Sequence, residues 1–315
     1  MSNLVKPPRL KPGQTIGLIS PSGAVRDGGG SPGTLEAARG RLAERGFETV
    51  LGRHALDARG YLAGSDAARV EDLHAMFRDP GVHGVLCVRG GYGAMRLLDD
   101  LDYDLIGRCP KVFIGYSDIT ALHLAVHQRS GLITFHGPMA GALAEADPHD
   151  WTHLLRAVAS PEPLGPLTNP PGAPAIETLV PGVAEGPLLG GNLALVTALL
   201  GTPYQPAFEG AVLVLEDIVD HAYRLDRKLV QLRLAGALRD AAGVVIGECR
   251  VRAEASEPAL TVREILEDLI VPLGKPAIYG LACGHGTYHL TLPVGVRARL
   301  DATRRVLSIE EGAVV

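Results

Sequence analysis

The stretch from Lys111 to His127, KVFIGYSDITALHLAVH, constrains the fold of this chain more than any other part of it. Its apolar residues 112–114 are typical of a short buried strand, and from Asp118 onward apolar residues recur at helical spacing. Ser117 lies at the corner between them. A strand–Ser–helix corner presents a hydroxyl beside the unpaired N–H groups that begin a helix. Taken alone, the stretch favours a simpler interpretation, in which Ser117 or Asp118 only caps the helix.

Around this stretch, short strands alternate with helices, which predicts an α/β fold whose mostly parallel sheet is flanked by helices. In such sheets ligands collect at the carboxyl ends of the strands. Ser22, Gly90-Gly91 and Ser117 all come shortly after a predicted strand, so we expect them at one edge of the sheet. The predicted strands cover residues 15–20, 47–51, 84–88, 111–114 and 132–135, and the predicted helices cover 34–45, 65–78 and the segment after Ser117.

A proline-dense stretch between residues 160 and 187 is the best candidate for a linker between domains. We therefore expect an N-terminal domain over residues 1–168, a linker over 169–186 and a smaller C-terminal α/β domain over 187–315. The C-terminal strands are predicted at 211–215, 243–247 and 276–281, with antiparallel strands at 288–292, 296–300 and 306–309 and helices at 193–200, 223–238 and 261–270.

Composition argues against several classes of function. The formal net charge of −5 over 315 residues is small, so nothing favours binding to nucleic acid or to an anionic membrane. No apolar run approaches the length of a membrane span, and we expect no signal peptide. The four cysteines are widely spaced without a CxxC pair, which is typical of a reduced, cytoplasmic protein.

A serine hydroxyl becomes a good nucleophile only when a base takes its proton and a third group orients that base. His285 is the best candidate for the base, because it directly follows a predicted strand and lies between glycines. Glu216 follows the apolar run of residues 211–215 and is better placed than its neighbour Asp217. His123 and His127 have the spacing of metal ligands on a helix, but the glutamate of HExxH is absent and ordinary helix residues are the better interpretation.

The glycine-rich segment Arg89-Gly-Gly-Tyr-Gly93 follows a predicted strand. It matches neither the P-loop nor the dinucleotide-binding pattern. A tight turn is the simplest interpretation. The alternative is an oxyanion hole, in which the backbone N–H groups of Gly91 and Asp118 would hold the developing charge.

A set of short motifs extends in order along nearly the whole chain. They are Ile19-Ser-Pro-Ser22, Arg89-Gly-Gly-Tyr-Gly93, Gly115-Tyr-Ser-Asp118, His136-Gly-Pro138, Gly190-Gly-Asn192, Leu215-Glu-Asp217, Tyr223-Arg-Leu-Asp-Arg227 and Gly284-His285. Together they resemble the LD-carboxypeptidase family of serine peptidases, which includes muramoyltetrapeptide carboxypeptidases and the microcin C self-immunity peptidases.

The resemblance implies a Ser-His-Glu triad of Ser117 as nucleophile, His285 as general base and then acid, and Glu216 as the group that orients it. It implies release of the terminal D-alanine from a cytoplasmic murein tetrapeptide in cell-wall recycling, without a metal or organic cofactor, by a homodimer. An exopeptidase must also bind a free carboxylate, for which Arg89 and Arg224 are candidates.

Other functions remain open at this point. The same triad could hydrolyse peptidyl or acylsulfamoyl nucleotide antibiotics, and an aromatic side chain that stacks on adenine would favour this alternative; Trp151 is the single tryptophan. A non-catalytic, two-lobed small-molecule binding protein is an alternative from another class.

Overall fold

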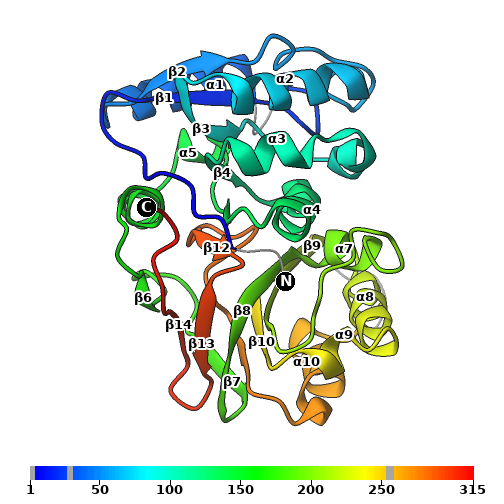
Figure 1. Cartoon of the computed structure of the whole chain (residues 1–315). Coiled ribbons are helices and arrows are strands. Elements are labelled where there is room, and N and C mark those ends of the chain that lie inside the picture. Colours follow the sequence, from blue (N-terminus) through cyan, green and yellow to red (C-terminus); the bar gives the residue numbers. More distant parts are fainter. Residues whose placement is uncertain (1–3, 27–30, 253–258) are drawn as a thin grey trace. The chain divides into compact units, whose positions relative to one another are not determined.

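The computed structural model describes residues 4–26, 31–252 and 259–315, which form two compact units (Figure 1). The first unit comprises Met1–Glu162, Thr291–Gly295 and Gly312–Val315. The second comprises Pro163–Leu290 and Val296–Glu311. Each unit is built on its own β-sheet.

The sheet of the first unit has six strands in the order β12-β5-β4-β3-β1-β2. All neighbouring strands are parallel except β12, which is antiparallel to β5. This confirms the predicted mostly parallel sheet. The strands are β1 (Thr15–Ile19), β2 (Glu48–Leu51), β3 (Val82–Cys87), β4 (Val112–Gly115), β5 (Thr134–His136) and β12 (Leu292–Val294).

Helices of the first unit pack in groups beside this sheet. α2, α3 and α4 contact one another in series, and α1 packs against α5. Ser65 begins α2 as predicted, because its hydroxyl accepts a hydrogen bond from the Ala68 N–H at 3.2 Å. The helices are α1 (Pro32–Ala43), α2 (Asp66–Arg78), α3 (Tyr103–Arg108), α4 (Thr120–Ser130), α5 (Ala140–Leu143) and α6 (Pro148–Ala159), with 3₁₀ turns η1 (Ala94–Asp100) and η2 (Ser117–Ile119).

The second unit contains an eight-stranded sheet in the order β6-β14-β13-β8-β9-β10-β11-β7. Its centre, β8-β9-β10-β11, is parallel, and the strands on either side are antiparallel. The strands are β6 (Gly165–Leu167), β7 (Glu177–Val180), β8 (Val183–Asn192), β9 (Val212–Val219), β10 (Gly243–Val251), β11 (Ala277–Tyr279), β13 (Arg297–Asp301) and β14 (Val306–Ile309). The α/β fold with antiparallel strands is therefore as predicted for the C-terminal part.

The helices of the second unit differ from the prediction at one point. A single helix is predicted over residues 223–238, but α8 ends at Leu234 and α9 begins at Ala237. Gly236 between them has φ of 82°, a left-handed conformation that ends the first helix. The helices are α7 (Leu193–Ala198), α8 (Ala222–Leu234), α9 (Ala237–Asp240) and α10 (Val262–Leu269), with the 3₁₀ turn η3 (Val271–Leu273).

The prediction for residues 288–292 is also wrong. The strand begins only at Leu292, and β12 pairs with β5 in the sheet of the first unit rather than with the antiparallel tail strands. The proline-rich residues 169–186 contain β7 and the beginning of β8.

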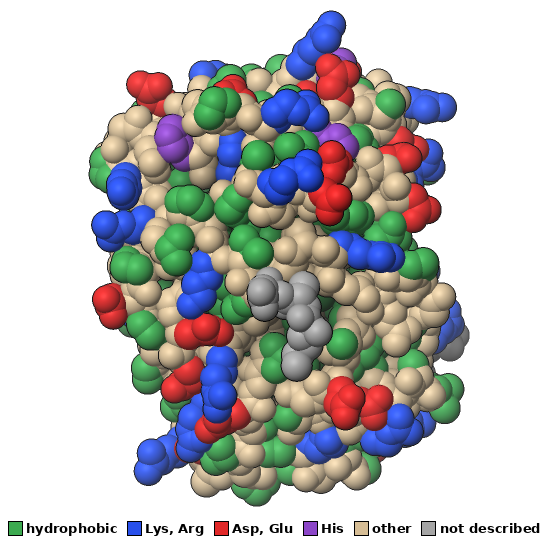
Figure 2. Space-filling view, viewed as in Figure 1, with side chains coloured by type: hydrophobic (Ala, Val, Ile, Leu, Met, Phe, Trp, Pro, Cys, Tyr) green, Lys and Arg blue, Asp and Glu red, His purple; other side chains and the backbone are tan. Residues whose placement is uncertain are grey.

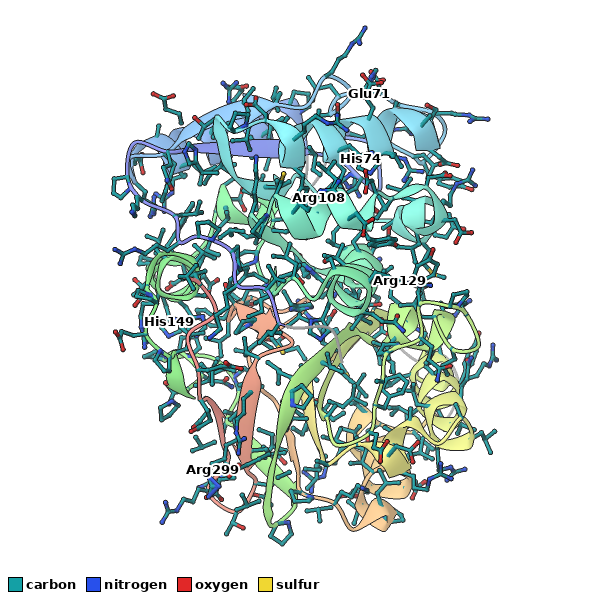
Figure 3. The ribbon with its side chains drawn as sticks, in the orientation of Figure 1. Glu71, His74, Arg108, Arg129, His149 and Arg299 are labelled. Carbon is teal, nitrogen blue, oxygen red and sulfur yellow. The ribbon has the colours of Figure 1, made fainter. Side chains whose placement is uncertain are left out.

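Several charged side chains on the outside of the units form ion pairs with neighbours in the same unit. Basic and acidic groups are interspersed on the face drawn in Figure 2. Of the side chains labelled in Figure 3, His74 accepts the Asp102 N–H at 2.9 Å, and Arg299 approaches Glu185 of the neighbouring strand at 3.3 Å. Within the described residues, no helix combines the length and the apolar character needed to cross a bilayer.

Candidate active site

The strand–Ser–helix corner is formed as predicted. Strand β4 is buried throughout, Tyr116 continues it in an extended conformation, and Ser117 then turns the chain into η2 and α4. Ser117 has φ of 61°. Among the described residues, Arg305 is the only other non-glycine residue with positive φ. Such strain in a non-glycine residue costs on the order of 1–3 kcal/mol and is concentrated at functional sites, which supports a role for this hydroxyl.

The glycine-rich loop lies directly against this serine. A Cβ atom added to Gly90 would lie 3.0 Å from the Cβ and 3.2 Å from the Oγ of Ser117. The Gly23 N–H donates to the carbonyl of Gly90 at 3.2 Å, so the turn after β1 borders the same loop. The predicted gathering of these segments at one edge of the sheet is therefore confirmed.

Asp118 does not cap its own helix, so the capping interpretation is wrong. The N-cap position is Tyr116, without a side-chain hydrogen bond. The Asp118 carboxylate instead accepts hydrogen bonds from Ser22 Oγ at 2.5 Å and from the Ala94 N–H at 2.8 Å. It is 3% exposed, and burial raises the pKa of its carboxyl above the ordinary value. This side chain thus joins the serine corner to both neighbouring loops.

The histidines of the first unit have structural surroundings. His123 Nε2 lies 2.8 Å from the Gly115 carbonyl, and burial lowers the pKa of His123 to about 3. His127 is half-buried in the same helix, and burial lowers its pKa as well. No group of three or more metal-ligating side chains occurs among residues 4–26, 31–252 and 259–315. The interpretation of the His123–His127 pair as ordinary helix residues agrees with this packing.

In the second unit, Glu216 and His285 are in contact. His285 Nδ1 lies 2.7 Å from Glu216 Oε2, and the carboxylate, on β9, is fully buried. The amide of Asn192 donates to Glu216 Oε1 at 3.2 Å. A carboxylate held in this way keeps the imidazole in one orientation.

Asp217, the competing candidate, is engaged elsewhere. Its Oδ2 pairs with Lys228 Nζ of α8 at 2.6 Å, and its Oδ1 accepts the Ile218 N–H at 2.9 Å. Burial raises the pKa of the Asp217 carboxyl. Glu216 is thus the acid of this pair that contacts a histidine, in agreement with the preference for Glu216. The strand was predicted to end at residue 215, however, and β9 continues through both acids to Val219.

Glycines make this contact possible. Gly284, with φ of 105°, lies so close to Glu216 that an added Cβ atom would be 2.3 Å from Oε2. An added Cβ at Gly190, at the end of β8, would lie 2.0 Å from the Val214 carbonyl. Any side chain at these residues would push apart the segments that carry Asn192, Glu216 and His285.

The candidate carboxylate-binding arginines have different surroundings. Arg89 Nη1 donates to the Ala24 carbonyl at 2.9 Å, and its Nη2 lies 3.8 Å from the Cβ position of Gly91. Arg224 lies on α8, with its guanidinium 5.9 Å from the Tyr223 ring. Arg89 is therefore the candidate that borders the glycine-rich loop.

Comparison with known proteins identifies the family. The model of the LD-carboxypeptidase N-terminal domain matches residues 16–137, and the model of the LD-carboxypeptidase C-terminal domain matches residues 185–300. The chain is 40% identical over 316 residues to a probable murein peptide carboxypeptidase of Bacillus subtilis, covering 98% of this chain and 95% of the relative. It is 33% identical over 311 residues to the murein tetrapeptide carboxypeptidase of Pseudomonas aeruginosa, covering 92% and 94%.

Solved structures agree with this assignment. A muramoyltetrapeptide carboxypeptidase from Oxalobacter formigenes is similar with a TM-score of 0.81 and 30% identity over 95% of this chain and 99% of that one. An MccF-like protein from Bacillus anthracis is similar with a TM-score of 0.86 and 29% identity over 97% and 99%. The chain belongs to the LD-carboxypeptidase family.

Proposed function

We propose that this protein is a serine carboxypeptidase that releases the terminal D-alanine from murein tetrapeptides in the cytoplasm, as part of cell-wall recycling. The bond cut is the one between the L-centre of diaminopimelate and D-alanine. The observation that supports the proposal most strongly is the contact between Glu216 and His285, made by the residues that the family resemblance assigns to the triad.

In the proposed mechanism, His285 takes the proton of Ser117 as the hydroxyl oxygen attacks the scissile carbonyl. Because Nδ1 of His285 is engaged with Glu216, Nε2 is the nitrogen that exchanges this proton. The same nitrogen then donates the proton to the leaving amine of D-alanine. Water attacks the acyl-enzyme in a second step, with His285 again as the base.

The negative charge that develops on the carbonyl oxygen is stabilised by hydrogen-bond donors that are in place before the reaction. We assign this role to the N–H groups of Gly91 and Asp118, because the glycine-rich loop packs against Ser117 and Asp118 directly follows Ser117 in η2. A single donor of this kind contributes about 10²–10³ in rate.

The murein substrate is supported by the relatives in Bacillus subtilis, Pseudomonas aeruginosa and Oxalobacter formigenes, which are named for murein peptides. The alternative, a nucleotide-conjugated peptide antibiotic, has support from the similarity to MccF-like proteins. The single tryptophan adds no support to this alternative, because its side chain is in the core. Trp151 is 2% exposed and lies 3.8 Å below the Arg45 guanidinium, so it does not present a ring face to a nucleobase.

The decisive experiment is incubation of the purified protein with a murein tetrapeptide, followed by mass spectrometry for the tripeptide and D-alanine. We expect cleavage by the wild type and none by Ser117→Ala. A peptidyl nucleotide incubated in parallel tests the alternative, and cleavage of that conjugate alone would replace the murein proposal. If Ser117→Ala binds the tetrapeptide as the wild type does and neither protein cleaves either compound, the chain is a binding protein.

The proposal also includes a homodimer, as the family resemblance implies. Sedimentation equilibrium of the full chain tests it: a single species of 33.1 kDa at all concentrations would contradict it.

A further inference from the structure

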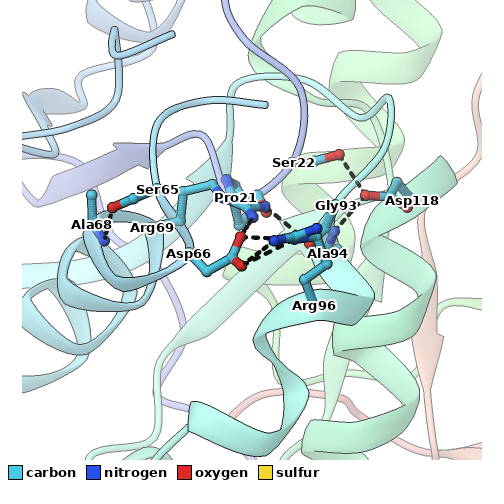
Figure 4. Close-up of polar contacts among 10 residues, drawn as sticks. All are labelled: Pro21, Ser22, Ser65, Asp66, Ala68, Arg69, Gly93, Ala94, Arg96 and Asp118. Carbon is cyan, nitrogen blue, oxygen red and sulfur yellow. Dashed lines mark hydrogen bonds and ion pairs between the residues drawn. The ribbon is translucent and has the colours of Figure 1, made fainter. Parts of the chain in front are cut away.

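Arg69 is a charged side chain in an almost fully buried place. It lies in the first turn of α2, one helical turn before Leu73 on the buried side of the helix, and is 1% exposed. Its Nη1 donates to the Pro21 carbonyl at 2.7 Å and to the Gly93 carbonyl at 2.9 Å (Figure 4). A single guanidinium thus joins the turn that precedes Ser22 to the end of the glycine-rich loop.

The charge of Arg69 is balanced by its neighbours on the same side of the loop. Arg69 Nη2 pairs with the Asp66 carboxylate, which also binds Arg96 through Nε at 2.9 Å and Nη2 at 2.6 Å. Hydrogen bonding to Arg96 lowers the pKa of Asp66. A buried ion pair of this kind adds little stability compared with apolar residues of similar size. Its contribution is better sought in the geometry that it imposes.

The same loops are joined a second time, by Asp118. Arg69 binds the carbonyls of Pro21 and Gly93. Asp118 binds the residue that follows each of these, through the hydroxyl of Ser22 and the N–H of Ala94. Gly93 has φ of 126°, and an added Cβ atom there would lie 2.7 Å from Arg69 Nη1, so the close approach of the guanidinium requires this glycine.

Gly90 and Gly91 lie within the loop whose end these contacts hold, and Gly90 packs against Ser117. We propose that Arg69 is a positioning residue for the reaction, which keeps the Gly91 N–H at the place where the carbonyl oxygen of the substrate becomes negative. This proposal rests on the proposed function, and it adds a residue that none of the family motifs contains.

The test compares Arg69→Lys with Arg45→Lys. Lysine keeps the charge of Arg69 but lacks the planar fork that reaches both carbonyls and Asp66. We expect kcat of Arg69→Lys to fall by about 10- to 100-fold, which is less than the roughly 10²–10³ lost when one oxyanion donor is removed, because the Gly91 N–H is displaced and not deleted, with KM changed less than about threefold. Arg45 is the control, because its side chain, 21% exposed against 1% for Arg69, is also largely withdrawn from solvent in the first unit and binds the Arg41 carbonyl at 2.8 Å, away from both loops. Arg45→Lys should keep kcat within about twofold.

A second measurement needs no substrate. Hydrogen exchange of the folded proteins should be faster in Arg69→Lys than in the wild type for amides of residues 88–98, and unchanged for amides of α4 in the same unit. Equal exchange of residues 88–98 in both proteins would overturn the proposal. So would an unchanged kcat of Arg69→Lys.

These readouts separate the two proposals. If the wild type does not cleave the tetrapeptide, the proposed function fails, and the exchange measurement still decides whether Arg69 orders the loop. If the wild type cleaves it and Arg69→Lys cleaves it equally fast, only the role of Arg69 is refuted.

Discussion

The contact between Glu216 and His285 depends on the absence of a side chain at residue 284. A Cβ atom added to Gly284 would lie 2.3 Å from Glu216 Oε2 and 2.7 Å from Glu216 Cβ. Both separations are far below a van der Waals contact. Since Glu216 is fully buried on β9, Gly284→Ala must displace either the carboxylate or the segment that carries His285.

The size of the effect follows from two contributions. Alanine at φ of 105° costs at least the roughly 1–2 kcal/mol of a left-handed residue. Loss of the hydrogen bond between the carboxylate and the imidazole costs about 1.5–3 kcal/mol more. We therefore expect the free energy of unfolding to fall by about 3–5 kcal/mol. We expect kcat/KM to fall by about 10² or more, because a catalytic group displaced by about 1 Å loses that much rate.

The control is Gly274→Ala. Gly274 lies in the same unit with φ of 64°, and an added Cβ atom would meet nothing within 4 Å. This variant carries the conformational cost of about 1–2 kcal/mol but no collision. Urea unfolding and initial rates on the tetrapeptide measure both effects. Equal kcat/KM values for Gly284→Ala and Gly274→Ala would refute the reasoning.

Three further predictions concern single side chains. Arg89→Lys should raise KM about tenfold and leave kcat within about threefold of the wild-type value, because lysine cannot bind a carboxylate through two parallel hydrogen bonds. An unchanged KM in initial-rate measurements would exclude Arg89 as the residue that binds the substrate carboxylate. Burial lowers the pKa of His153 to about 4. Between about pH 6.5 and 4 the unfolded chain therefore binds a proton that the folded chain does not. The free energy of unfolding should fall by up to about 3 kcal/mol as the pH is lowered over this range. The free energy of unfolding of His153→Gln, measured by urea unfolding, should fall less over this pH range. Equal falls in the two proteins would contradict the lowered pKa of His153. Because Arg96 lowers the pKa of Asp66, the wild type should be more stable than Asp66→Asn at pH 7, and this advantage should shrink as the pH falls from about 4 through the lowered pKa; no advantage in urea unfolding at pH 7 would argue against the ion pair.

Features that depend on neighbours in the chain were predictable. The cap at Ser65, the turn at Ser117 and the order of strands and helices around them follow from residue type and spacing over a few positions. The place of Ser22 and Gly90 beside Ser117 was predictable too, because successive parallel strands end at the same edge of a sheet.

The preference for Glu216 over Asp217 was less secure from the sequence, since both acids follow the same apolar run. Lys228 of α8 distinguishes them, because it pairs with Asp217 and not with Glu216. No local pattern contains this information. For Arg69 the sequence contained one signal, a charged residue one helical turn before Leu73 on the buried side of a helix. It contained no signal for the carbonyls of two loops that Arg69 binds.

The sequence by itself determined the class of fold and the serine corner, because strand and helix periods and turns are properties of contiguous residues. The residues of the candidate triad were predicted from the resemblance of the motifs to a family. Only the tertiary structure decided that β12 joins the sheet of the first unit, that Asp118 binds Ser22 and Ala94 instead of capping its helix, and that Trp151 lies in the core. These outcomes depend on which backbone groups still lack hydrogen-bond partners, and which spaces in the core are still unfilled, once the sheets have formed. The edge of β5, the Asp118 carboxylate and the Trp151 ring each contact groups that are distant in the sequence. The residues next to them in the chain do not specify these partners.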